Sequence, residues 1–101
     1  MNIKHIQILS EAEEDLNNGR IFYEEQEQGV GEYFWDAILS DIESLFIFAG
    51  IHIKEYGFYR MLSKRFPYFI YYDVKGDIAY VIAVLPMRRK PQWISERLNK
   101  S

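Results

Sequence analysis

An almost unbroken apolar run at residues 78–85, reading IAYVIAVL, constrains the fold more than any other part of the chain. A strand with one face in water alternates apolar and polar residues, whereas a run without polar positions predicts a strand covered on both faces. The rest of the chain must therefore supply elements that pack on each side of this strand.

Two more strands are predicted just before this run, and another near the start of the chain. Residues 58–62 and 66–74 have strand composition, and Lys75-Gly76 supplies a hairpin turn into the apolar run. Pro67 cannot donate to a ladder, so it should lie at the beginning of its strand or at an edge. Residues 3–9 alternate loosely and predict the first strand. In residues 66–74, one face should carry Phe66, Tyr68, Ile70 and Tyr72, and the other Phe69 and Tyr71.

The segment after the first strand predicts a helix that begins at about residue 11. Ser10 and Glu13 match the S-x-x-E capping box, with Ser10 as the N-cap. Gly29 and Gly31 should form the turn into a second helix. The apolar stripe of the first helix consists of Ala12, Leu16 and Tyr23.

The second helix has the clearest periodicity, because its apolar residues recur at spacings of three and four. Gly50 stands where a C-cap glycine belongs, and Pro91 is suited to the first turn of a short terminal helix. The apolar stripe of the second helix consists of Phe34, Ile38, Ile42, Leu45, Phe46 and Ala49. On the opposite, solvated face of the second helix we expect the acidic residues Glu32, Asp36, Asp41 and Glu43.

The predicted order is β-α-α-β-β-β with a short C-terminal helix. This is an α+β fold in which a helical hairpin packs on one face of an antiparallel-rich sheet, with the first strand beside the last. With 101 residues, 49% of them apolar, the chain suits one domain spanning residues 1–101. No apolar run reaches the roughly 18 to 20 residues that span a bilayer, so we expect a soluble, cytoplasmic protein without membrane partners. Cysteine is absent and His5 and His52 are isolated, so no metal or cofactor is expected.

Charge is segregated along the chain. Residues 1–50 contain two basic and eleven acidic residues, whereas residues 51–101 contain ten basic and four acidic residues. The acidic overall balance argues against a general nucleic-acid binder, which is normally basic throughout. A local basic surface for an anionic partner remains compatible with this pattern.

The basic residues gather at two places that are candidates for binding a partner. One is the aromatic-rich stretch at residues 58–74, and the other follows the last strand. Each cation could instead neutralise a carboxylate or keep an aromatic edge soluble. The candidate partner-binding residues are Arg60, Lys64, Arg65, Arg88, Arg89, Lys90 and Trp93.

The chain resembles the RelE/ParE superfamily of type II toxins over nearly its whole length, particularly the ParE-like and plasmid-stabilisation branch. The resemblance is carried by YEEQ at residues 23–26, by the GVG entry into the second helix at residues 29–31, and by GFYRML at residues 57–62. It continues in KRFPYFIYY at residues 64–72, AVL at 83–85 and RRKP at 88–91, followed by Trp93.

The resemblance implies a toxin that inhibits growth and is neutralised by a cognate antitoxin. ParE-like members bind DNA gyrase, whereas RelE-like members cleave messenger RNA on the ribosome. A third reading is a non-toxic relative kept as a binding protein. A homodimer and a toxin–antitoxin hetero-oligomer are both compatible with this class.

Cleavage of RNA would need cations, a base and an acid. By the resemblance, Arg60 matches the arginine that the RNase branch places on its second strand beside the substrate phosphate, and Arg88 or Arg89 approximates the arginine after its last strand. The candidate catalytic residues of an RNase are therefore Arg60 and Arg89. Pro86 occupies the position where that branch often has histidine, and Trp93 stands near its tyrosine, although indole cannot exchange a proton at neutral pH. His52 and Glu55 are candidate bases only if their loop folds over the sheet. We therefore favour the gyrase-binding mode.

Overall fold

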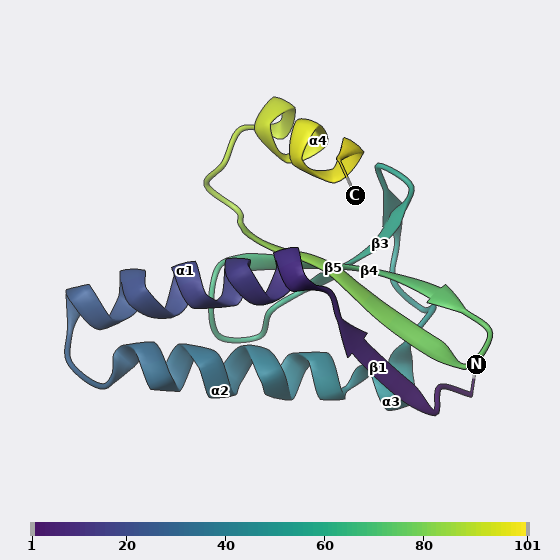
Figure 1. The fold of residues 1–101 in the computed structure, drawn as a ribbon, viewed down its shortest axis with the longest axis horizontal. Coiled ribbons are helices and arrows are strands. Elements are labelled where there is room, and N and C mark those ends of the chain that lie inside the picture. The colour runs from purple at the N-terminus through teal and green to yellow at the C-terminus, as the bar shows by residue number, and fades with distance from the viewer. Residues whose placement is uncertain (1, 101) are drawn as a thin grey trace.

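Five strands form one sheet in the order β1-β5-β4-β3-β2, as the computed structural model shows for residues 2–100 (Figure 1). β1 runs parallel to β5, and the other neighbours are antiparallel. The antiparallel-rich sheet and the place of the first strand beside the last were both predicted. The strands are β1 (His5–Ile8), β2 (Lys54–Glu55), β3 (Phe58–Leu62), β4 (Tyr68–Lys75) and β5 (Ile78–Pro86).

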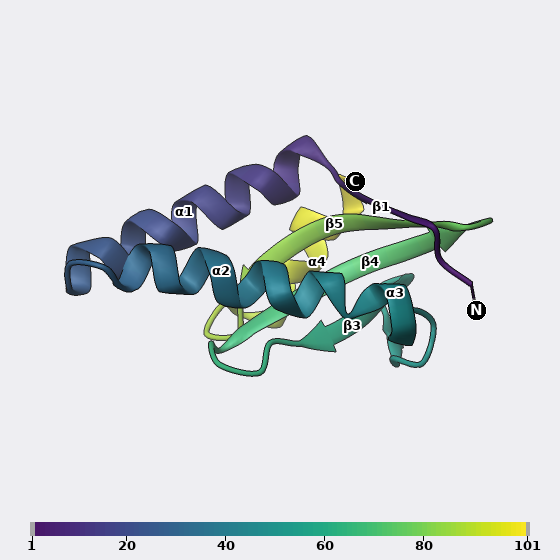
Figure 2. The same cartoon turned by 90° about the horizontal axis from the view of Figure 1, so that it is seen from below.

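Helices cover both faces of this sheet. α1 (Ser10–Gln26) and α2 (Val30–Glu43) form a hairpin on one face, and α4 (Pro91–Asn99) lies on the opposite face (Figures 1 and 2). Pro91 stands in the first turn of α4 as predicted, and Ile94 and Leu98 are buried against the sheet. Among residues 2–100, no helix is both long enough and apolar enough to cross a membrane.

The central strand β5 is covered on both faces, which explains its apolar composition. Ala79, Val81 and Val84 belong to the core beneath the helical hairpin, whereas Ala83 and Leu85 belong to the core beneath α4. The pairing with β4 is irregular, because Tyr71 opposes Ala83 while the next residue, Tyr72, opposes Val81. Ile82 is thereby an extra residue that lies on the same side as Ala83.

The alternation along β4 is also as predicted. Tyr68, Ile70 and Tyr72 are buried under the helical hairpin, with Phe66 packed against them. Phe69 and Tyr71 lie on the face that α4 covers. The strand itself begins after Pro67 rather than at Phe66.

Two predicted helix boundaries are wrong. Leu9, not Ser10, is the N-cap of α1, and no side-chain hydrogen bond caps the helix, so the capping box does not form. Gly31 lies inside α2, and the turn is made at Gly29, whose φ of 91° suits glycine. A Cβ at Gly31 would lie 2.5 Å from the carbonyl oxygen of Arg20, which shows how closely the two helices approach.

The second predicted helix is interrupted at Ser44, and the short helix α3 (Leu45–Phe48) follows. Phe46 is therefore 46% exposed and does not belong to the core stripe. Asp41 is buried rather than solvated, because it accepts hydrogen bonds from Ser63 Oγ (2.6 Å) and the Lys64 N–H (3.3 Å). This carboxylate ties α2 to the β3–β4 turn. The two-residue strand β2 was not predicted.

Candidate functional site

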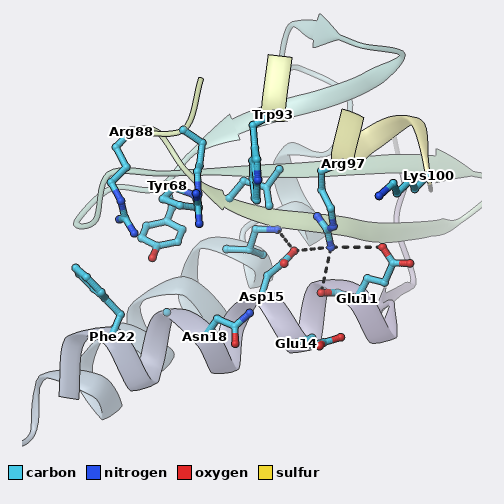
Figure 3. Close-up of a pocket in the computed structure, with 15 residues that line it drawn as sticks. Glu11, Glu14, Asp15, Asn18, Phe22, Tyr68, Arg88, Trp93, Arg97 and Lys100 are labelled. Atoms are coloured by element: carbon cyan, nitrogen blue, oxygen red, sulfur yellow. Dashed lines mark hydrogen bonds and ion pairs between the residues drawn. The ribbon is translucent and has the colours of Figure 1, made fainter. Parts of the chain in front are cut away.

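A groove of about 500 Å³ separates α1 from the segment that runs from the end of β5 into α4 (Figure 3). α1 supplies Glu11, Asp15 and Phe22 to one wall, at spacings that place them along one side of the helix. The opposite wall comes from the second half of the chain, which is basic. Segments of opposite charge therefore meet across this groove.

At one end of the groove, an ion-pair cluster joins α4 to α1. Arg97 Nη2 lies 2.9 Å from Asp15 Oδ2 and 3.5 Å from Glu11 Oε2 (Figure 3). Asp15 Oδ2 also accepts a hydrogen bond from the Val84 N–H at 3.0 Å. Burial raises the pKa of Asp15 to about 6, because desolvation outweighs the Val84 hydrogen bond and the Arg97 charge. The Arg97 cation at this end of the groove is thus already paired within the protein.

The other end contains the two adjacent arginines that follow β5. The guanidinium carbon of Arg88 lies 4.9 Å from the Phe22 ring centroid, and that of Arg89 lies 4.4 Å from the Trp93 ring. Within residues 2–100, the ion pairs involve only Arg60 and Arg97 as cations, so neither Arg88 nor Arg89 has a carboxylate partner there. Two guanidinium groups without a carboxylate partner, each close to an aromatic ring, therefore line this end of the groove.

Arg60 lies elsewhere, on the sheet face that carries Phe69 and Tyr71. Its Nη1 is 2.6 Å from Glu55 Oε2, and its guanidinium carbon is 4.8 Å from the Phe69 ring centroid. Burial and the Glu55 charge raise the pKa of the neighbouring Tyr71 to about 12, although the Arg60 charge opposes them. Arg60 does not line the groove of Arg88 and Arg89.

The remaining predicted cations are exposed and lie outside the groove. Lys64 and Arg65 occupy the turn before β4, which Asp41 fastens to α2. Lys90 is the N-cap residue of α4 and is also exposed. Of the seven predicted partner-binding residues, the groove thus brings together Arg88, Arg89 and Trp93.

The candidate bases are separated from the groove arginines. Glu55 is held by Arg60, and His52 Nδ1 is hydrogen-bonded to the hydroxyl of Tyr72. Burial lowers the pKa of His52. His5 is exposed on β1. The loop before β3 therefore does not deliver a base to Arg88 and Arg89.

Sequence reasoning missed the contribution of α1 to the groove. Glu11, Asp15, Asn18 and Phe22 recur at spacings of four, three and four, and all line the groove. That helical pattern was a usable signal, because it runs beside the buried stripe of Ala12, Leu16 and Gly19.

The architecture is a ParE-like fold, as the resemblance to the RelE/ParE superfamily implied. A solved structure described as the chromosomal ParDE TA system from P. aeruginosa contains a similar chain, with a TM-score of 0.76. The match covers 85% of this chain and 98% of the other at 14% sequence identity. No family model and no curated protein matches the sequence.

Proposed function

We propose that the chain is the toxin of a bacterial type II toxin–antitoxin pair and that a cognate antitoxin neutralises it. The proposed mode of action is ParE-like: the protein binds DNA gyrase in the cytoplasm and inhibits growth. The ParE-like fold supports the class, and the placement of the cations supports binding over RNA cleavage.

The observation that carries the choice of mode is the separation of the predicted catalytic arginines. Arg60 in β3 is paired with Glu55 in β2, whereas Arg89 lies close to the Trp93 ring in the groove beside α1. RNA cleavage requires several groups to converge on one phosphate, and these two arginines belong to different sites. Tyr71, the phenol beside Arg60, is a weak candidate for a base because its pKa is about 12.

Inducible expression of the chain, alone and together with the neighbouring gene, tests the class. We expect growth inhibition when the chain is expressed alone and recovery when a cognate antitoxin is co-expressed. Unimpaired growth at confirmed expression of folded protein would favour the non-toxic relative instead.

Two further measurements test the target. Purified protein should reduce DNA supercoiling by gyrase, while primer extension should find ribosome-bound messages intact. New cuts within codons together with normal supercoiling would replace gyrase binding with the RelE-like endoribonuclease activity.

A further inference from the structure

The arginine end of the groove has the donors that a carboxylate group needs. Arg97 in the same groove is already bound to Asp15 and Glu11, but Arg88 and Arg89 contact aromatic rings instead of acids within the described part of the chain. Each guanidinium group has five N–H donors, and although Arg88 also interacts with the Tyr68 hydroxyl, both groups line the groove with donors left for a partner. These donors match the two oxygens of a carboxylate in a bidentate geometry.

The walls beside these arginines are partly apolar. Phe22 is 38% exposed and Trp93 is 37% exposed, although both are large aromatic residues. Phe22 projects from α1 toward Arg88, and Trp93 projects from α4 further along the groove, between Arg88 and Arg97 in this view (Figure 3). An apolar side chain next to the bound carboxylate would therefore gain contact with a ring that otherwise faces water.

The charges along the rest of the groove favour a peptide over a nucleic acid. Beyond these two arginines the groove has mixed charge: Glu11, Glu14 and Asp15 line it together with Arg97 and Lys100, and Arg97 is already paired with Glu11 and Asp15. A nucleic-acid strand carries a phosphate at every nucleotide and would place some of them against these carboxylates. A peptide can confine its acidic group to the arginine end and continue along the groove with neutral or basic residues.

We propose that Arg88 and Arg89 bind an acidic side chain of an extended or helical protein segment, whose apolar neighbour packs on Phe22 and Trp93. The identity of this segment as part of the antitoxin rests on the proposed function. The preference of the groove for an acidic, partly apolar peptide follows from the contacts above and is independent of toxicity.

Selection of random twelve-residue peptides displayed on phage against the whole protein tests the proposal. We expect the recovered peptides to be enriched in Asp or Glu beside an aliphatic or aromatic residue. Their affinity should fall about tenfold or more for Arg88→Gln combined with Arg89→Gln, because charge-assisted hydrogen bonds are lost. Replacing the peptide carboxylates with amides should have the same effect.

Lys64→Gln combined with Arg65→Gln is the matched control, since it removes two adjacent exposed cations outside the groove. It should leave peptide affinity unchanged. In a Trp35→Phe background, Trp93 is the remaining tryptophan, and its fluorescence should change on binding.

Three results would overturn the proposal. They are a selection that yields no peptide dependent on Arg88 and Arg89, recovered peptides without acidic enrichment, and displacement of the peptides by a twelve-nucleotide single strand at equal concentration. The last result would assign the arginine end to nucleic acid. None of these results bears on growth inhibition, which is tested separately by expression.

Discussion

Three arginines of this fold differ in what surrounds their charge. Arg97 is held by two carboxylates, Arg60 by one carboxylate and a ring, and Arg89 by a ring. A cation that is already paired adds little to binding, because a partner must first displace its carboxylate. The surroundings of each side chain therefore distinguish Arg97, whose charge is paired within the fold, from Arg89, whose charge has no carboxylate partner among the described residues.

Asp15 should give unfolding a measurable pH dependence. Its pKa is raised to about 6 from 3.8, so the folded protein binds this proton more tightly than the unfolded chain. The resulting stabilisation is fully present below pH 3.8 and is lost as the pH rises through 6. Relative to Asp15→Asn, the free energy of unfolding of the native protein should therefore increase by on the order of 2 kcal/mol between pH 7 and 4.

Urea denaturation of both proteins across that range provides the measurement. The Asn variant is a suitable reference because its amide oxygen can still accept from the Val84 N–H. Parallel stability profiles for the two proteins would contradict the raised pKa.

The helical hairpin depends on glycines that allow two elements to approach closely. A Cβ at Gly19 would lie 2.4 Å from Phe34 Cε1, and a Cβ at Gly31 would meet the backbone of α1. Phe34 is fully buried and stacks on Tyr23, so the hairpin and its aromatic core share this contact. Small residues at these positions bring α1 and α2 together.

Gly31→Ala should destabilise the protein although alanine is the better helix former. The intrinsic preference for alanine contributes about 1 kcal/mol, but the methyl group would meet a carbonyl oxygen that can move only with its helix. We expect a net loss of about 1 to 3 kcal/mol in the free energy of unfolding, measured in urea. Ser40→Ala, at an exposed position of α2, is the control and should change stability by less than about 0.5 kcal/mol. A more stable Gly31→Ala protein would show that the helices can separate without cost.

Elements determined by local pattern could be predicted from the sequence, and contacts between distant elements could not. The two faces of β4 follow from apolar side chains that alternate along the strand, and the buried residues of α4, Ile94 and Leu98, follow from a spacing of about one helical turn. The burial of Asp41 depends instead on Ser63, which only the folded chain brings beside α2. β2 is short and paired at one edge, so its few residues carry little signal of their own.

At the scale of the molecule, the predicted site divides into two. The basic second half supplies Arg60 to one sheet face and Arg88 and Arg89 to the groove against the acidic first helix. The sequence singled these residues out as candidate partner-binding cations, but it could not show which of them share a surface. That depends on how α1 and α4 pack.

Arg60→Ala combined with Arg89→Ala should relieve growth inhibition without unfolding the protein. The loss of stability should be about 1 kcal/mol, since the Glu55 partner of Arg60 is 36% exposed. Growth after induction and a circular-dichroism melt measure the two effects. Arg60→Met combined with Glu55→Gln removes the ion pair without leaving an unpaired charge, and it separates a structural role of Arg60 from a binding role. Full toxicity of the double alanine variant would exclude both arginines from the functional surface.

Because β1 pairs with β5, the sheet cannot be completed during synthesis until β5 has emerged. His5 in β1 is synthesised well before its partner Ile78 in β5, and β4, which joins β5 to the other strands, also follows both helices of the hairpin in the chain. The helical hairpin can form early, but its apolar side has no sheet to cover until β4 and β5 emerge. The groove comes last, because it needs Arg88, Arg89 and α4. A nascent chain therefore acquires its proposed binding surface only after α4 has been synthesised.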